Sequence, residues 1–450
     1  MANRPKVLLI TAKTVRPKYQ CMPLIGVAYI ASYLRERGID VDILDATALD
    51  VSYEGVVEYV SFYGFDFVGI TAIAATYQSA LRHLREIKEA HPEIITVIGG
   101  PHATALHEQV VMENDFVDYC VRGEGEITAY DLIDTLWKGG DVSKVKGVTF
   151  KRDGQVTITP PRPYIEDLDI LPYPALDLMP LHEYYFEMRG LATRKDLVLP
   201  FCSGRGCYSN CGFCASKMMW GGPRMRTVDK VIEELVWMRE KYDMDVLFSY
   251  DDIMSANRKW LIEFCQKFIE AGLNDIRWSC DARADTLTDE MLMWLKKANC
   301  AYVLLGLEFG TQRLLDMTNK KLKLSKVKEA VKMIRKHGIN SCGSFIIGYP
   351  TETKQEILQT GRFARSLNLD AVLTNLAVPY PGTEMYDFCV KHDLLLGNLD
   401  DEAYGSPLIP MVKLEGITPE ETVKLLGKVH RIIKFSPQYV ANKIRNRLTT

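Results

Sequence analysis

Residues 197–214 of this 450-residue chain read LVLPFCSGRGCYSNCGFC, an apolar run that ends directly in a cysteine-rich loop. The run 197–201 is short and continuously apolar, which is typical of a buried β-strand. Cys207, Cys211 and Cys214 follow it with the spacing CxxxCxxC. Thiolates are soft ligands that suit iron–sulfur clusters and zinc, so three of them on one loop predict a metal centre at the end of this strand.

The number of thiols separates these two kinds of metal centre. An iron–sulfur cluster usually takes four cysteine ligands, so a cluster held by three leaves one iron open to another ligand. A structural zinc site needs a fourth cysteine or histidine, and residues 183–336 contain no histidine. Cys202 is near in the sequence, but it directly follows the apolar strand residues and does not fit the CxxxCxxC spacing. We therefore expect Cys207, Cys211 and Cys214 to hold a [4Fe–4S] cluster, with zinc as the alternative.

The chain around this loop alternates between strand and helix. Six apolar runs of strand length lie between residues 197 and 395, separated by helical text such as 228–240 and 325–337. The strand candidates are residues 197–201, 246–250, 277–280, 302–307, 343–347 and 371–378. Because strands that alternate with helices form parallel sheets, the six units predict a partial (β/α)6 barrel.

The amino-terminal region shows a second alternation of the same kind. Its strand candidates are residues 6–10, 41–44, 67–71, 95–98 and 119–121, and helical text at 26–37 and 77–90 separates some of them. This order predicts an α/β, Rossmann-like, doubly wound sheet with its ligand site beyond the carboxyl ends of the strands.

Four regions follow from these patterns. Residues 1–140 form the doubly wound domain, and residues 141–196 are a proline-bearing linker with a small hairpin at Asp153-Gly154. Residues 197–395 form the partial barrel. Residues 396–450 form a small helical domain, with two helices expected between 419 and 445.

Composition narrows the class of protein. The chain is 47% hydrophobic and 25% charged, with a net charge of −3, so no basic field favours nucleic acid or an anionic membrane. The apolar run at residues 7–10 is too short for a signal sequence or a membrane span, so we expect a cytoplasmic protein. The cysteines outside the 202–214 cluster have no regular spacing, which is typical of small buried side chains.

The run from Cys202 to Cys214, with Phe213 before the third cysteine, resembles the signature loop of the radical S-adenosylmethionine (SAM) superfamily. This resemblance implies that the open iron binds the amino and carboxylate groups of SAM. It also implies that one electron from the cluster breaks the S–C5′ bond, and that the resulting 5′-deoxyadenosyl radical abstracts hydrogen from an unactivated carbon.

Downstream segments match the same family in order. Asp251 and Asp252 follow the second strand, where the resemblance implies groups near the methionine moiety; the alternative is a helix-capping turn. Arg283 resembles a cation near the SAM carboxylate, the alternative being a surface arginine, and Glu308 resembles the acidic residue near the ribose. The segment 343–350 resembles the strand beside the adenine.

Two residues of that last segment and three amino-terminal segments complete the resemblance. Gly348 and Pro350 are the expected contacts beside the adenine. Segments 23–38, 98–104 and 121–126 resemble the cobalamin-binding domain of the B12-dependent radical SAM subfamily. The contacts that this implies are Thr71, Ala74, Thr76, Tyr77, Gly99, Gly100, His102, Gly123 and Glu124. For the glycine pair, a tight turn is the alternative.

One departure concerns the cobalt. Cobalamin proteins that place a histidine on cobalt carry a DxHxxG loop, and this chain contains no Asp-x-His. The resemblance therefore implies methylcobalamin in a base-off form with no histidine ligand. The loop 71–77 is expected to cover its lower face, and His102 to lie nearer the nucleotide tail.

The reaction expected from this resemblance is methylation of an unactivated carbon by methylcobalamin. It needs a low-potential electron donor of the flavodoxin or ferredoxin type, and an organic or peptide substrate that the sequence does not identify. The alternatives are a cobalamin radical enzyme that does not methylate, such as the anaerobic cyclase of bacteriochlorophyll synthesis, and a non-catalytic Fe–S sensor. A methylthiolating enzyme would need a second cysteine triplet, whereas only Cys21 and Cys120 precede residue 200.

Overall fold

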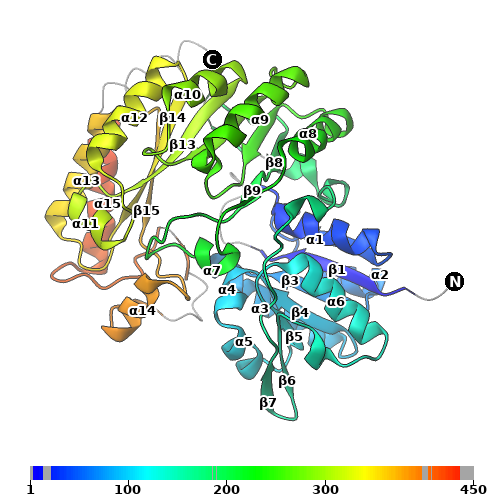
Figure 1. The fold of residues 1–450 in the computed structure, drawn as a ribbon. Helices are drawn as coiled ribbons and strands as arrows, with labels where there is room; N and C mark the ends of the chain where they lie inside the picture. The colour runs from blue at the N-terminus through cyan, green and yellow to red at the C-terminus, as the bar shows by residue number, and fades with distance from the viewer. Residues whose placement is uncertain are drawn as a thin grey trace. The chain divides into compact units, whose positions relative to one another are not determined.

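The computed structural model describes residues 4–13, 22–184, 186–188, 190–397, 404–406 and 408–435. These residues belong to two compact units (Figure 1). The first consists of the described residues within Met1–Phe186, Met218–Arg224 and Leu399–Tyr404, and the second of the described residues within Glu187–Lys217, Met225–Asn398 and Gly405–Thr450.

The first unit is built on one sheet with the strand order β2-β1-β3-β4-β5-β6-β7. The strands are β1 (Lys6–Thr11), β2 (Asp40–Asp45), β3 (Phe67–Thr71), β4 (Ile95–Gly99), β5 (Tyr119–Val121), β6 (Val148–Arg152) and β7 (Gln155–Ile158). Strands β1 to β5 are parallel, and β6 and β7 are antiparallel additions. The order 2-1-3-4-5 confirms the doubly wound sheet, and its direction reverses between β1 and β3.

Helices cover both faces of this sheet. They are α1 (Ile25–Glu36), α2 (Tyr53–Tyr63), α3 (Tyr77–Ala90), α4 (Pro101–Ala105), α5 (His107–Glu113) and α6 (Gly125–Trp137). Helix α1 packs against α6, and α2 packs against α3. A core of aliphatic side chains from β1, β3 and β4 lies under α2, α3 and α5.

The hairpin expected in the linker is part of this sheet. Strands β6 and β7 meet at Asp153-Gly154, where both residues have positive φ, 52° and 76°. Two consecutive residues with positive φ give the turn that suits a two-residue hairpin. Strand β6 then pairs with β5, from Tyr119 opposite Phe150 to Val121 opposite Val148. The first unit therefore continues well beyond residue 140.

The second unit is a half-barrel of six parallel strands in the order β15-β14-β13-β12-β11-β8. The strands are β8 (Val198–Phe201), β11 (Val246–Ser249), β12 (Arg277–Ala282), β13 (Cys300–Glu308), β14 (Asn340–Ile347) and β15 (Ala371–Leu376). This confirms the partial barrel. Strands β13 and β14 begin earlier than expected because polar residues such as Asn340 pair there, opposite Tyr302.

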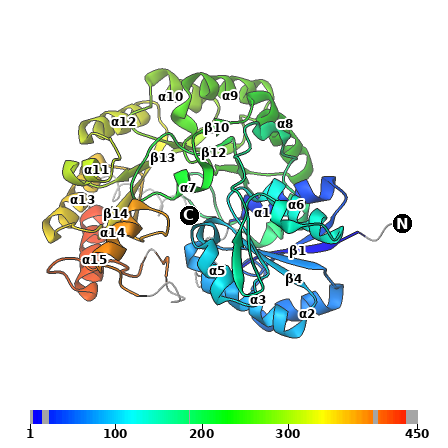
Figure 2. The ribbon, with the colours of Figure 1, turned by 60° about the horizontal axis from the view of Figure 1, so that its bottom comes forward.

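Helices follow one another around the outside of the half-barrel (Figure 2). They are α8 (Val228–Tyr242), α9 (Arg258–Glu270), α10 (Asp289–Lys297), α11 (Gln312–Met317), α12 (Leu324–Lys336) and α13 (Lys354–Leu367), and α14 (Glu384–Lys391) comes after β15 in the chain. Shorter elements are β9 (Gly204–Arg205), α7 (Ser216–Trp220) and β10 (Arg224–Met225).

Helix α15 (Pro419–Lys434) closes the described chain and packs on α13. A Cβ on Gly361 of α13 would lie 3.4 Å from the Cα of Val429, so the two helices approach closely. The second carboxyl-terminal helix that we expected falls mostly beyond residue 435, outside the described residues. Among the helices that are described, none has the length and apolar character needed to cross a membrane.

Candidate functional site

The three expected cysteine ligands lie on one loop after β8 and β9. Cys207 and Cys211 are half-buried, and Cys214 is exposed. Burial raises the pKa of the Cys211 thiol. Desolvation of the sulfur atom raises the pKa of Cys214 to about 11, although the residue as a whole is exposed. Within the described part of the chain, no three His, Cys, Asp or Glu side chains are already gathered as a metal site. Because thiolates are the ligand form, metal binding here would release protons.

Backbone hydrogen bonds fix the middle of this loop. The Gly212 N–H donates to the carbonyl of Thr318 at 3.0 Å, and the Gly212 carbonyl accepts from the Met385 N–H at 2.8 Å. A Cβ on Gly212 would lie 2.8 Å from Oε2 of Glu384, so a glycine is needed for this approach. The donor set, three thiols on a loop held at its centre, fits an iron–sulfur cluster with an open iron.

Cys202 is held apart from these three. Its thiol donates to the carbonyl of Gly204 at 2.9 Å, and burial raises its pKa to about 12. This backbone hydrogen bond and its place before the CxxxCxxC spacing set Cys202 apart from the three expected ligands.

Asp251 and Asp252 hold the beginning of the loop. Asp251 is buried and accepts from the backbone N–H groups of Ser203 at 2.9 Å and Gly204 at 2.6 Å, and also from the Ser203 and Ser249 hydroxyls. Burial raises its pKa to about 6. Asp252 accepts from the Gly206 N–H at 3.0 Å. The structure thus shows both carboxylates bound to the segment before Cys207; their expected place near the methionine moiety stays a prediction.

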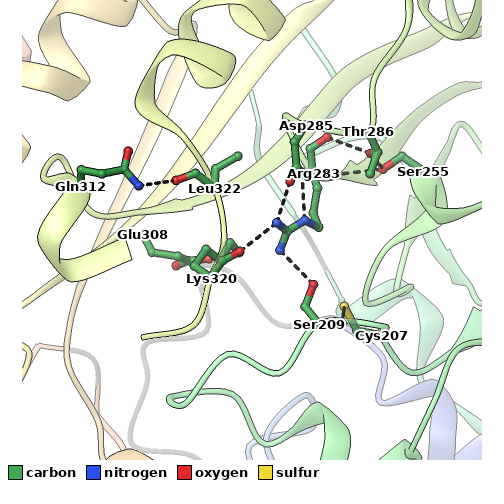
Figure 3. A network of polar contacts seen from close by, with 10 residues as sticks. All are labelled: Cys207, Ser209, Ser255, Arg283, Asp285, Thr286, Glu308, Gln312, Lys320 and Leu322. Carbon is green, nitrogen blue, oxygen red and sulfur yellow. Dashed lines mark hydrogen bonds and ion pairs between the residues drawn. The ribbon is translucent and has the colours of Figure 1, made fainter. Parts of the chain in front are cut away.

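Arg283 connects the loop to two other segments (Figure 3). Its Nη1 donates to the Ser209 hydroxyl at 2.9 Å, and its Nη2 donates to the Lys320 carbonyl at 2.9 Å. Asp285 accepts from Nε at 3.0 Å and from Nη2 at 2.9 Å. Arg283 is therefore a buried positioning group and not a free surface arginine.

Glu308 forms a buried ion pair with Lys320, a residue that sequence reasoning missed. Oε1 of Glu308 lies 2.8 Å from Nζ of Lys320, and the side chains are 11% and 9% exposed. A Cβ on Gly306 would lie 2.6 Å from Oε1 and 3.1 Å from Nζ, so this glycine makes room for the pair. In the sequence, Lys320 sits in Asn-Lys-Lys, which has the pattern of an exposed basic turn.

The inner face of the half-barrel carries a second residue that sequence reasoning missed. This residue is Asp281 on β12, which lies opposite Leu304 of β13. Two residues farther along β13, Gly306 lies opposite Ser344 of β14, and Ser344 lies opposite Leu373 of β15. These residues are partly exposed, whereas their neighbours along β12, β13 and β14 are buried beneath the helices. Desolvation of its carboxylate, followed by the charges of Asp251 and Asp252, raises the pKa of Asp281 well above its usual value. Its period-two place in an apolar strand was the available signal.

The turn after β14 is built around a buried carboxyl. Gly348 has φ +82°, and its N–H donates to Oε2 of Glu352 at 2.6 Å. Pro350 is buried in the same turn. Burial raises the pKa of Glu352 to about 8.

An aromatic series links the cysteine loop to this turn. The ring centroids of Phe213 and Phe309 are 6.2 Å apart, and those of Phe309 and Tyr349 are 5.5 Å apart. Both pairs are edge-to-face, which is a favourable geometry for aromatic rings. The structure therefore brings the expected cluster loop and the expected adenine segment into one packed series.

The carboxyl edge of the first unit's sheet contains buried polar atoms without protein partners. Oγ1 of Thr11 and both ring nitrogens of His102 have no hydrogen-bond partner among the described residues. Thr11 ends β1 opposite Thr71, which ends β3, so it lies where the direction of the sheet reverses. A buried polar group without a partner is costly, and a ligand that supplies hydrogen bonds at this edge would satisfy these atoms.

Several expected cobalamin contacts are close to this edge. The His102 ring lies 4.4 Å from the Tyr77 ring and 6.3 Å from the Tyr404 ring, and burial lowers its pKa to about 4, so it is neutral. Ala74 and Thr76 form a short 3₁₀ turn before α3, with Oγ1 of Thr76 accepting from the Ile73 N–H at 3.2 Å. The structure thus gathers the loop after β3 with His102.

Close packing of the backbone explains why glycine is present at positions 99 and 100. Gly100 has φ +93°, and a Cβ there would lie 2.7 Å from the Ala72 carbonyl oxygen and 2.8 Å from Oγ1 of Thr71. A side chain on Gly99 would lie 3.5 Å from the Val121 carbonyl oxygen. The close approach of the loops after β3 and β4 therefore requires Gly100 even without a ligand.

Gly123 and Glu124 follow β5, and Glu124 has protein partners. The Gly123 N–H donates to Oγ1 of Thr104 at 3.1 Å. Glu124 pairs with Arg224 at 3.0 Å, with side chains that are 3% and 14% exposed, and it accepts from the Ile165 N–H at 2.7 Å. Glu124 therefore connects residues that are far apart in the sequence of the first unit, and its contact with cobalamin stays a prediction.

Two family models match the chain, one on each part. The B12 binding domain model matches residues 14–133, and the Radical SAM superfamily model matches residues 201–364. The second match contains Cys207, Cys211 and Cys214, and the first contains the β3 and β4 loops.

Similar proteins share both parts. An uncharacterized methyltransferase of Pyrococcus horikoshii is 33% identical over 426 residues, which cover 94% of this chain and 90% of that protein. The anaerobic magnesium-protoporphyrin IX monomethyl ester cyclase of Rubrivivax gelatinosus is 33% identical over 371 residues, 81% of this chain and 66% of that protein. The solved structure of the radical SAM methyltransferase TsrM from Kitasatospora setae, with cobalamin and a [4Fe-4S] cluster bound, has a TM-score of 0.70 at 16% identity over 87% of this chain and 75% of that one. This structural likeness confirms the fold.

The assignment of three cysteines, and not four, is testable by metal content. Alanine at Cys207, Cys211 or Cys214 should remove most of the iron and sulfide that the wild-type chain takes up on anaerobic reconstitution, because a cluster has no spare thiolate in this loop. The matched control is Cys202→Ala, which should keep its iron. Zinc in place of iron in anaerobically purified wild-type protein would contradict the assignment.

The Glu124–Arg224 pair should stabilise the first unit. Arg224→Met leaves a buried carboxylate without its cation and should cost about 3 kcal/mol of unfolding free energy. Glu124→Gln combined with Arg224→Met should cost less than Arg224→Met alone, because no buried charge remains. Urea unfolding of the apo chain followed by circular dichroism measures both changes.

A control for this pair lies in the same unit. Arg35 and Asp177 form an ion pair of 2.7 Å whose side chains are 45% and 35% exposed. Arg35→Met should cost below about 1 kcal/mol, because solvent screens exposed pairs. If Arg224→Met were no more destabilising than Arg35→Met, the structural role of the buried pair would be wrong.

Proposed function

The chain belongs to the radical SAM enzymes that carry an amino-terminal B12-binding domain, and from this premise we propose that it methylates an unactivated carbon of its substrate. The observation that carries the proposal is the loop of three thiols at the carboxyl ends of parallel half-barrel strands. This loop occurs in one chain with a doubly wound sheet whose carboxyl edge has buried polar atoms that no described residue satisfies.

The residues at these two edges have separate tasks in the proposed reaction. Cys207, Cys211 and Cys214 would hold the cluster, and Glu308, with Gly348 and Pro350, would bind the nucleoside of SAM. When bound, these cofactors supply one electron, hydrogen abstraction by the 5′-deoxyadenosyl group, and a methyl group carried by cobalamin. The inner-face residues of the half-barrel would orient the reactants, because the alternate side chains of the same strands are packed beneath the helices and keep the strands in place.

For cobalamin we propose the base-off form with no histidine on cobalt. The loop Thr71–Tyr77 contains no histidine, and its most exposed apolar side chain is Ile73, at 40%. His102 is neutral and buried against Tyr77, so we assign its ring nitrogens to the polar periphery or nucleotide tail of cobalamin. An apolar loop below the corrin would supply no strong ligand to cobalt.

The reaction also needs partners. Reduction of the cluster and of the corrinoid requires a low-potential electron donor, for which a flavodoxin or ferredoxin in the cytoplasm is suited. We expect an organic or peptide substrate in the half-barrel, where Asp281 and Leu373 offer one acidic and one apolar contact.

A second candidate function has its own support. The chain is 33% identical to a cyclase that is named for a magnesium-protoporphyrin ester, so a non-methylating reaction of the same cofactors is the alternative. The two functions differ in the fate of the methyl group, because only methylation consumes the methyl group of SAM in the product.

Labelled SAM distinguishes the two functions. Reconstituted protein with cobalamin, a titanium(III) citrate reductant and deuteromethyl SAM should form 5′-deoxyadenosine and a product that gains one deuterated methyl group, detected by mass spectrometry. Peptide and small-molecule fractions from cells that express the protein anaerobically serve as substrates. The Cys211→Ala variant is the control and should form neither. Substrate-dependent 5′-deoxyadenosine with an unlabelled oxidised or cyclised product would contradict methylation and support the alternative.

The ligand of cobalt is testable by electron paramagnetic resonance. Cob(II)alamin bound to the chain should give a base-off spectrum without nitrogen superhyperfine splitting, because no imidazole or benzimidazole nitrogen is bound to cobalt. His102→Phe, which keeps an aromatic ring against Tyr77, should leave the spectrum unchanged while weakening cobalamin binding. Nitrogen splitting that disappears in His102→Phe would make His102 the lower ligand and overturn this part of the proposal.

A further inference from the structure

Lys320 lies in the segment that holds the cysteine loop in place. The Thr318 carbonyl accepts from the Gly212 N–H at 3.0 Å, and Nδ2 of Asn319 donates to the Asn210 carbonyl at 3.0 Å. The Lys320 carbonyl accepts from Arg283, which also donates to Ser209 of the same loop (Figure 3). Three consecutive residues are thus hydrogen-bonded, directly or through Arg283, to the loop between Cys207 and Cys214.

The Lys320 side chain is buried and keeps its charge. It is 9% exposed, and its Nζ lies 6.0 Å from the ring centroid of Phe213, the residue directly before Cys214. Burial lowers the pKa of Lys320, but the charge of Glu308 and the thiol of Cys211 outweigh it, so the pKa is raised above its usual value. The ammonium group is therefore protonated at neutral pH.

The ammonium group is the end of the Glu308–Lys320 pair that contacts the cysteine loop. Nζ of Lys320 lies 6.0 Å from the ring centroid of Phe213, and the two residues just before Lys320 are hydrogen-bonded to the same loop. The Glu308 carboxylate extends from the end of β13, where Gly306 leaves space for it, and lies 2.8 Å from Nζ.

We propose that Lys320 is a positioning residue that raises the reduction potential of the cluster held by Cys207, Cys211 and Cys214. The inference rests on the proposed function, because it requires the cluster. On reduction the cluster gains one electron and the external donor loses one, and no proton or covalent bond is exchanged. A fixed buried cation favours the form with the additional electron, since net charge near a cluster is one of the factors that set its potential.

Arg283 does not account for this effect. Its guanidinium makes a two-point ion pair with Asp285, at 3.0 and 2.9 Å, which offsets its charge at the loop. Lys320 is bound to its carboxylate through one oxygen only, Oε1 of Glu308 at 2.8 Å, so its charge is less fully offset at the loop.

The test is a redox titration of the reconstituted full-length protein, monitored by electron paramagnetic resonance of the reduced cluster. Lys320→Met should shift the midpoint potential to more negative values, and Lys320→Arg should restore it toward wild type. Glu308→Gln should shift it to more positive values, because the cation then lacks its partner. Lys323→Met, an exposed lysine three residues away, is the matched control and should leave the potential unchanged.

Turnover gives a second readout. Lys320→Met should form 5′-deoxyadenosine more slowly than wild type with dithionite, and a more strongly reducing titanium(III) citrate solution should recover most of the loss. A residue that only supports the fold would show no such recovery.

The outcomes separate this inference from the proposed function. A wild-type chain that takes up no iron and sulfide contradicts the proposed function itself. A complete cluster with the same potential in wild type and Lys320→Met overturns the role of Lys320 alone. Should Lys320→Met fail to assemble a cluster, Glu308→Gln decides, because an unchanged or more negative potential in that variant also overturns the inference.

Discussion

Two adjacent carboxylates fix the backbone from which the cysteine loop begins. Asp251 and Asp252 accept from the N–H groups of Ser203, Gly204 and Gly206, and these are the residues between the first strand of the half-barrel and Cys207. Asp251 does so from a buried position, where a hydrogen bond to an ionised group is strong and leaving it unmade is costly. The direction in which the three thiols leave the sheet depends on these bonds.

The sequence predicted the parts of the fold that local patterns encode. Period and composition located the parallel strands, and the two-residue turn at Asp153-Gly154 located the hairpin. These patterns did not reveal that β6 pairs with β5. A hairpin has two open edges, and its own residues do not determine which neighbouring strand pairs with either edge. The early starts of β13 and β14 were also missed, since polar residues such as Asn340 interrupt the apolar pattern while still pairing through the backbone.

The same distinction between local and long-range information applies to the site. The cysteine spacing is local, so Cys207, Cys211 and Cys214 could be selected from the sequence alone. Lys320 could not be selected, because its role depends on a partner elsewhere in the fold, Glu308 at the end of β13. It also depends on the conformation of its own turn, where Asn319 and Lys321 have positive φ. Glu124 shows the converse. Its glycine-flanked motif predicts a ligand contact, which stays a prediction, but it did not reveal the partner that the structure shows, a cation 100 residues away in the sequence.

Backbone strain at Glu308 indicates that the pair is set before any cofactor binds. Glu308 has φ +63° at an irregularity in the pairing of β13 with β14. A side chain other than glycine in this region costs about 1–2 kcal/mol, and such strain persists only where the surroundings determine the conformation. Here the surroundings are the Lys320 ammonium and the space left by Gly306, which together hold the carboxylate in place. The energetic costs of the strain and of desolvating both charges arise during folding. Reduction of a neighbouring cluster would therefore require little further rearrangement of this pair. A fixed charge influences a reduction potential most effectively under this condition.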